Sequence, residues 1–196
     1  MATPVGHAIA GYAVYSFARS PARSARLGLM LLVAFAAIAP DLDVIPGLLV
    51  GRPAQYHGGI SHSLGMAVAA GLVLAALFRG RGVPFVTVFL LTFVAYSSHL
   101  ALDMLGPDAR SPIGIPVLWP ISGSYFISPI SVLPGVHHAA ATSTGTLDWI
   151  RALLSLPNVA AIVFEVALVT PVILVGRLLR GRSAKAERAQ VEAERI

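Results

Sequence analysis

The sequence has no cysteine and few charged residues. With no Cys among its 196 residues, it cannot form a disulfide framework, a thiolate metal site or a cysteine nucleophile. Only 12% of the residues are charged, whereas soluble domains carry roughly 25%. A water-soluble domain of this size needs more polar residues for its surface. Lipid contact removes that need, and it fits a chain that is 56% hydrophobic.

Positive charge is also missing ahead of the first apolar stretch. Residues 1–15 contain no Lys or Arg, and Arg19, Arg23 and Arg26 follow them. A cleavable signal peptide carries its positive charge first. The observed order instead predicts a first helix that is retained, with its N-terminus outside.

The apolar runs predict an all-α, polytopic membrane bundle of about five helices. We expect them at about 4–17, 27–40, 63–78, 84–105 and 158–179. The second run is interrupted by Asp41 and Asp43, and it either ends at Pro40 or continues toward Val50. Only the last two runs have the roughly 20 residues that a full span needs.

Two further segments complete the predicted organisation. Residues 106–157 are rich in Pro, Gly and Ser and too long for a passive turn, so we expect an extracytoplasmic loop or lid there. Residues 1–182 then form one membrane-embedded domain, and residues 183–196 form a charged helical tail.

Basic residues divide unevenly between the two ends of these helices. If the helices alternate in direction, eleven basic residues share one side and three share the other. The first set is Arg19, Arg23, Arg26, Arg79, Arg81, Arg177, Arg180, Arg182, Lys185, Arg188 and Arg195, and the second is Arg52, Arg110 and Arg151. The positive-inside rule makes the first side cytoplasmic. We therefore expect a multi-pass protein of the cell membrane with five crossings, N-terminus out and C-terminus in. Membrane lipid is the expected partner, and nucleic acid is not.

The same alternation brings histidines and aspartates to the outer ends of the helices. They are His7, Asp41, Asp43, His57, His62, His99 and Asp103. Because His99 and Asp103 are four residues apart, they share one helix face. Isolated charge is costly in apolar surroundings, and a divalent ion would offset that cost. Imidazole with carboxylate suits zinc first and manganese second, so the pattern predicts a metal site at the outer face.

Each of these residues also has a simpler interpretation. His99 and Asp103 could be a structural hydrogen-bonded pair, and Asp41 and Asp43 a solvated helix end. The histidines 57, 62, 137 and 138 could be exposed in loops. Glu165, inside the last apolar run, is either functional or paired with a polar group of another helix. Arg52 and Arg110 could clamp an anionic substrate or be solvated.

Five stretches carry a resemblance to a known family. They are Thr-Pro-x-x-His (3–7), Pro-Asp-Leu-Asp (40–43), His-x-Gly-x-Ser-His-Ser (57–63), His-Leu-x-x-Asp (99–103) and Gly-x-Pro-x-Leu-Trp-Pro (114–120). Over about residues 3–126 the chain resembles the small bacterial membrane-bound, metal-dependent hydrolases that include a LexA-controlled member. Gly58 departs from the family pattern, in which many members have arginine at this position, and Ser61 stands where threonine is common. Loss of that arginine weakens an anion clamp, for which Arg52 could substitute.

The order of the motifs also resembles the helical zinc-dependent phospholipase C and nuclease group. That group continues with a further histidine and a His-x-x-x-Glu pair, which this sequence lacks, so one or two ions are implied rather than three. The resemblance implies hydrolysis of a phosphoester such as a lipid headgroup. The seven residues above would share the metal, a metal-free carboxylate such as Asp43 would act as general base, and Arg52 or Arg110 would steady negative charge. The alternatives are a metal-ion transporter and a non-catalytic membrane protein with a structural metal.

Overall fold

The computed structural model describes residues 1–18, 23–52, 55–109, 111–137, 151–152 and 154–193. Within these ranges the regular structure is helical. Strand-like pairing there is limited to one isolated antiparallel bridge between Ile115 and Phe126. The predicted all-α class is confirmed.

The helices follow the predicted apolar runs closely. They are α1 (Pro4–Ser16), α2 (Arg23–Ile38), the 3-10 helix η1 (Ala39–Asp43), α3 (Val44–Leu49), α4 (Leu64–Leu77), α5 (Phe85–Met104) and α7 (Leu156–Ala193). Short polar side chains begin two of them. Thr3 caps α1 by accepting a hydrogen bond from the Gly6 amide, and Ser63 caps α4 by accepting one from the Met66 amide.

The second predicted helix continues past Pro40. Helix α2 leads directly into η1 and α3, which gives a helical run from Arg23 to Leu49. Pro40 and Pro46 each lie in the first turn of a new helical segment. Proline is tolerated there because its missing N–H would have no partner within that segment. The run therefore changes helix type at Asp41 and Asp43 without breaking.

Among the residues that the structure describes, three helical stretches are long and apolar enough to cross a membrane. They are Arg23–Leu49, Phe85–Met104 and Leu156–Ser183. Helices α1 and α4, with 13 and 14 residues, reach only about 20 Å, whereas the hydrocarbon core is about 30 Å thick. Full crossings by α1 and α4 therefore remain a prediction.

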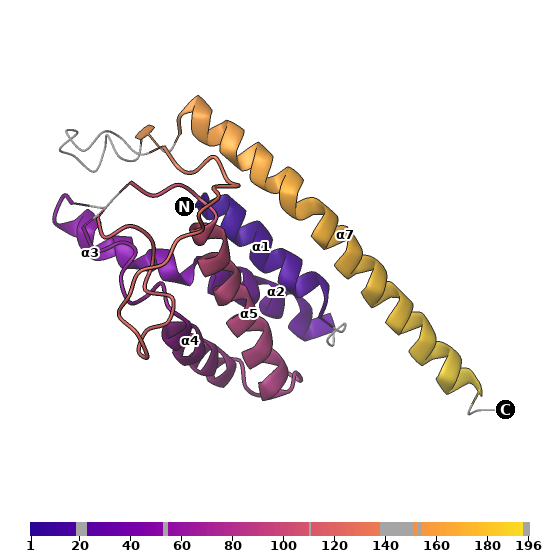
Figure 1. The fold of residues 1–196 in the computed structure, drawn as a ribbon. Helices are drawn as coiled ribbons and strands as arrows, with labels where there is room; N and C mark the ends of the chain where they lie inside the picture. The colour runs from indigo at the N-terminus through magenta and orange to yellow at the C-terminus, as the bar shows by residue number, and fades with distance from the viewer. Residues whose placement is uncertain (19–22, 53–54, 110, 138–150, 153, 194–196) are drawn as a thin grey trace.

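Small residues let α1 lie at the centre of the bundle. Helix α1 packs against α2, α5 and α7, and α5 packs against α2 and α4 (Figure 1). A Cβ atom on Gly11 of α1 would lie 2.8 Å from Ala37 Cβ of α2, so only glycine permits this approach. Large apolar side chains such as Leu27 (63% exposed) and Leu77 (68% exposed) remain on the outside. Such an outer surface suits contact with lipid.

Helix α7 continues well beyond the bundle. It has 38 residues, so it is about 57 Å long, and Figure 1 shows it running along one side of the molecule past the other helices. The predicted boundary between residues 182 and 183 falls inside this helix.

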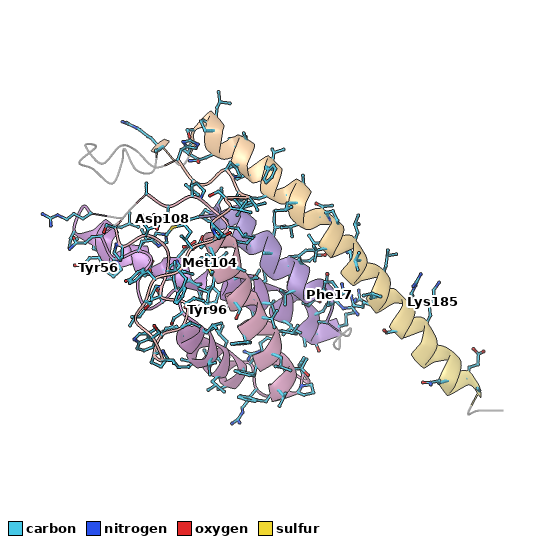
Figure 2. All side chains as sticks on the ribbon, viewed as in Figure 1. Phe17, Tyr56, Tyr96, Met104, Asp108 and Lys185 are labelled. Carbon is cyan, nitrogen blue, oxygen red and sulfur yellow. The ribbon has the colours of Figure 1, made fainter. Side chains whose placement is uncertain are left out.

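The described part of the predicted lid covers one end of the bundle. Leu64 and Gly65 at the start of α4 donate backbone hydrogen bonds to Val117 and Trp119. After α5, the Ser128 amide donates to Met104. Figure 2 labels Tyr56, Met104 and Asp108 at this end, whereas Phe17 and Lys185 lie toward the other end.

Candidate metal centre

Four elements bring histidines and aspartates to one end of the bundle. They are α1 with His7, η1 with Asp41 and Asp43, the loop before α4 with His57 and His62, and the last turns of α5 with His99 and Asp103. The side chains of His7, His62 and His99 are almost fully buried. The predicted convergence is therefore present in the structure.

His99 presents its Nε2 atom to the centre of this cluster. Its Nδ1 lies 2.8 Å from the backbone carbonyl of Ala37. A carbonyl oxygen can only accept, so Nδ1 carries the proton and Nε2 of the neutral ring has a free lone pair. That Nε2 lies 3.2 Å from His62 Nε2, 3.2 Å from Asp103 Oδ2 and 3.5 Å from Asp41 Oδ1.

Asp43 orients the two loop histidines in the same way. Its Oδ1 lies 2.8 Å from His57 Nδ1, and its Oδ2 lies 3.2 Å from His62 Nδ1. The Ser61 hydroxyl donates to Oδ2 at 2.6 Å and the Gly58 amide at 3.1 Å. Because an ionised carboxylate only accepts hydrogen bonds, both Nδ1 atoms carry protons. The Nε2 atoms of both rings then lie on the side of Asp41, 3.8 and 3.7 Å from its Oδ1.

The cluster contains two overlapping sets of residues whose atoms could hold a metal ion. One set is His7, Asp41, His99 and Asp103, and the other is Asp41, His57 and His62. Within each set the ligand atoms lie within 4.8 Å of one another. Asp41 belongs to both sets and Asp43 to neither. The sequence pattern gave no reason to prefer one of these two aspartates as a metal ligand, and the geometry favours Asp41.

Unpaired buried atoms indicate that a cation fits here. Asp103 Oδ2 and His7 Nδ1 are buried without a hydrogen-bond partner. Asp103 Oδ2 faces the Nε2 atoms of His99 and His62 at 3.2 and 3.4 Å, and a metal ion or a proton between these atoms would offset the cost of burying the carboxylate. The imidazole and carboxylate donors suit zinc or manganese. The cluster is thus able to hold a metal ion.

The charge balance at His62 favours a cation as well. Burial disfavours the protonated ring, but the neighbouring carboxylates of Asp103, Asp41 and Asp43 outweigh burial and raise the pKa of His62 well above its ordinary value. Positive charge is therefore favoured at the centre of the cluster, whether a proton or a metal ion carries it.

One side of the cluster opens to a pocket. The pocket has a volume of about 180 Å³, and its walls include His57, Tyr56, Asp108 and Tyr125. The side chains of Asp41 and His57 keep 20% and 13% of their surface exposed, whereas those of His62 and His99 are fully buried. The Asp41–His57 side is therefore the accessible one.

Of the other predicted candidates, Arg52 and His137 lie within the described residues, and neither has a side-chain contact with the cluster there. Arg52 is exposed, and its side chain makes no hydrogen bond or ion pair with the cluster residues that the structure describes. Arg110 and His138 lie outside the described residues. His137 is exposed, and its backbone pairs with the Asn158 side chain at 2.7 and 2.9 Å.

Glu165 meets a polar group of another helix, which was one of its two expected roles. Its carboxylate accepts a hydrogen bond from the Thr3 amide at 2.9 Å and another from the Thr3 hydroxyl. It also packs directly against Gly6. The adjacent Ala2 amide donates to Asp103 Oδ1 at 3.1 Å. Residues 1–3 therefore connect α7 with the cluster.

Met1 contacts His57, which the sequence did not indicate. Its Sδ lies 3.0 Å from His57 Nε2. No periodicity or motif identifies a methionine at this position, so the only available signal was its closeness to Thr3 and His7 in the sequence.

The comparisons with known proteins agree with the predicted resemblance. Searches of curated proteins and of solved structures give no match. A family model, described as YdjM inner membrane protein, matches residues 1–181, which extends the predicted resemblance of 3–126 through the last apolar span. This family is the LexA-regulated group of membrane-bound, metal-dependent hydrolases that the motifs predicted. The chain, an inner membrane protein with a buried His/Asp cluster, belongs to the YdjM inner membrane protein family.

Proposed function

We propose that this protein is a metal-dependent hydrolase whose substrate is a phosphoester, such as a lipid headgroup. One observation carries the proposal. The Nε2 atoms of His62 and His99 lie 3.2 Å apart, and both nitrogens are free of protons when the rings are neutral. Two facing lone pairs beside carboxylate oxygens repel one another unless a proton or a metal ion lies between them, and the imidazole and carboxylate donors around them suit a divalent metal. The family match and the adjoining pocket support the same proposal.

The two ligand sets lead us to assign two ion positions. His7, His99 and Asp103 would hold the deeper ion, and His57 and His62 the outer one. Asp41, which belongs to both sets, would bridge them. Zinc is our first choice and manganese our second, because imidazole and carboxylate ligands suit both.

Asp43 has a positioning role in this proposal. It accepts hydrogen bonds from Ser61 and Gly58 and holds the Nδ1–H groups of His57 and His62. Four donors leave it no free lone pair directed at a substrate, so it is a poor general base. Carboxylates that hold histidine ligands in this way set both the tautomer and the ring orientation.

Substrate would approach from the pocket beside His57. When bound, a divalent ion supplies Lewis acidity that acidifies water and polarises a phosphoryl oxygen. His57 and Asp41 lie at the open side, so they would face the reacting group. Tyr56 and Tyr125 would enclose a small headgroup. A pocket of about 180 Å³ is too small for a folded macromolecule.

Arg110 is our candidate for contacting an anionic group of the substrate. Its sequence neighbours Asp108 and Ser111 line the pocket. Arg52 is less suited, because it is absent from the pocket wall. An Arg110→Gln variant would test this role by raising KM for an anionic substrate more than it lowers kcat.

We further propose that the cluster faces the outer side of the membrane. Arg23 and Arg26 begin α2, whereas Asp41 follows its end. Arg177 and Arg180 likewise lie far along α7 from Asn158, which contacts the lid residue His137. The arginine-rich end is therefore opposite the cluster, and the positive-inside rule makes it cytoplasmic.

Hydrolysis fits this arrangement better than ion transport or a purely structural metal. Transport sites usually lie near the bilayer midplane, whereas this cluster lies at one end, and the carboxylate of Glu165 is engaged with Thr3 at the start of α1. A structural site is normally closed, whereas His57 here lines a pocket and the Asp41 side chain is 20% exposed.

The test is metal-dependent turnover by the purified protein. Metal content would be measured by mass spectrometry, and hydrolysis would be followed with bis(p-nitrophenyl) phosphate and with a panel of phospholipids. We expect turnover with zinc or manganese that is lost in His99→Ala and kept in His137→Ala. Ion flux in proteoliposomes without turnover would favour transport, and bound metal with neither activity would favour a structural role.

A further inference from the structure

A second polar pocket lies at the end of the bundle opposite the metal cluster. Its volume is about 560 Å³. Four arginines line it, two from the start of α2 and two from α7: Arg23, Arg26, Arg177 and Arg180. Along α2, Arg26 and Ile38 are about 18 Å apart, so this pocket is separate from the cluster that begins beyond Ile38.

The arginines are arranged by aromatic residues of α1. The Arg180 guanidinium lies 5.2 Å from the ring centre of Tyr15, and that of Arg177 lies 6.0 Å from the ring centre of Tyr12. Guanidinium groups over tyrosine rings are held by cation–π attraction. Tyr15 also donates a hydrogen bond to the backbone carbonyl of Arg26 at 3.4 Å. Three helices thus contribute to one polar pocket.

No carboxylate of the described residues balances this charge. Among them, none of the four arginines forms an ion pair with Asp or Glu. Four like charges around one pocket repel one another, and they repel more strongly where lipid lowers the local dielectric. An anion from outside the chain would relieve that repulsion. Arginine is suited to the task because its planar group holds phosphate oxygens through two parallel hydrogen bonds.

We propose that this pocket binds the phosphate headgroup of an anionic phospholipid. The lipid source is favoured over a soluble phosphate because Leu27 and Met30 form an apolar part of the wall, and Leu27 is 63% exposed on the outside of a candidate span. A headgroup on the arginines would therefore leave its acyl chains against the lipid-facing side of α2. Basic pockets between transmembrane helices are known binding sites for anionic headgroups.

Membrane topology alone does not require the four arginines to share one pocket. The positive-inside rule depends on the number of Lys and Arg residues near a span, and it is indifferent to whether they share a pocket. An Arg177→Lys/Arg180→Lys variant keeps that number while it removes the planar groups. Arg182→Gln is the matched control, because Arg182 lies on the same helix, is exposed and is absent from the pocket wall.

The experiment is native mass spectrometry of the purified full chain with defined lipids. We expect the wild-type protein to retain one phosphatidylglycerol molecule in preference to phosphatidylcholine, and Arg182→Gln to do the same. The Arg177→Gln/Arg180→Gln variant should bind phosphatidylglycerol at least about tenfold more weakly, since it loses the charge-assisted hydrogen bonds that two guanidinium groups would donate to the phosphate. The affinity of the Arg177→Lys/Arg180→Lys variant for phosphatidylglycerol should lie between those of the wild-type protein and the glutamine variant.

Three results would overturn the proposal. One is equal retention of the two lipids by the wild-type protein, which requires no variant to fold. Another is a loss in Arg182→Gln as large as that in the pocket variant, because simple net charge would then explain binding. The third is displacement of the lipid by soluble glycerol phosphate at equal concentration, because a free phosphoester would then be the ligand.

Discussion

The imidazole rings of His7 and His99 lie stacked, with their centres 3.7 Å apart and their planes at 20°. They are 92 positions apart in the sequence and come from α1 and α5. This contact brings a short helix of 13 residues into the same site as a candidate span. Two ligands from separate helices can share one ion, or two adjacent ions, only if they lie close together, and this contact meets that requirement.

Removing His99 should abolish a metal-dependent gain in stability. If the concentration of free ion is about 100 times the Kd, binding stabilises the folded state by about 2.7 kcal/mol. This corresponds to a rise of roughly 5 °C or more in Tm. Chelation of the purified wild-type protein should therefore lower Tm by that amount, as measured by differential scanning fluorimetry. His99→Ala should show almost no response to the chelator, while His137→Ala should respond like wild type. An unchanged chelator effect in His99→Ala would remove His99 from the ligand set.

Asp41 and Asp43 should behave differently when each is replaced by asparagine. Asp41 belongs to both ligand sets, so Asp41→Asn should reduce the number of bound ions. Asp43 holds two histidines without lying in either set, so Asp43→Asn should keep the number of ions and weaken affinity by roughly 10–100-fold. Competition with a fluorescent chelator measures both quantities. The reverse pattern would make Asp43 the ligand and Asp41 the positioning residue.

Gly6→Ala should destabilise the fold. A Cβ atom at position 6 would lie 2.7 Å from the carboxyl carbon of Glu165, and it would displace the side chain that accepts the Thr3 hydrogen bonds. Overpacking of this kind costs about 1–3 kcal/mol. Gly181→Ala is the matched control, since a Cβ atom there meets nothing within 4 Å and alanine favours a helix by up to about 1 kcal/mol. Equal thermal stability of the two variants would argue against close packing at Gly6.

Introduced cysteines should report the orientation directly. The chain has no cysteine of its own, so each single-cysteine variant carries one reactive thiol. Ile121, which is 93% exposed, lies in the lid, and Ser183 lies on the exposed part of α7. In intact cells a membrane-impermeant maleimide should label Ile121→Cys and leave Ser183→Cys unlabelled until the cells are opened. The opposite pattern would place the cluster on the cytoplasmic side.

The sequence predicted which residues lie close together, but not which of them would bind metal and which would position the ligands. Convergence followed from alternating helices, because that alternation returns His7, Asp41 and His99 to the same end. The distinction between Asp41 and Asp43 did not follow, because it depends on η1 and on Ser61 and Gly58 of a neighbouring loop. Periodicity carries no information about such local backbone turns.

Proline did not mark the end of either helical run that contains it, and of the two expected ends for the second helix the later one is confirmed. Pro40 raised the prospect of a helix end, yet the helical run reaches Leu49 because Pro40 and Pro46 each occupy a first turn. Pro171 lies inside α7 without ending it. Met1 near His57 was unpredictable for a different reason, since long-range packing of a chain end leaves no pattern in the residues around it.

The hydrogen bonds between Thr3 and Glu165 make the cluster dependent on a helix that contributes no residue to it. A truncated chain that stops before residue 156 would retain all seven clustered histidines and aspartates. It would also leave the Thr3 amide and hydroxyl without their acceptor, in surroundings where water is scarce. Such a fragment would carry every recognisable motif of the family and still assemble the centre poorly, so sequence motifs alone are an unsafe guide to where this protein can be shortened.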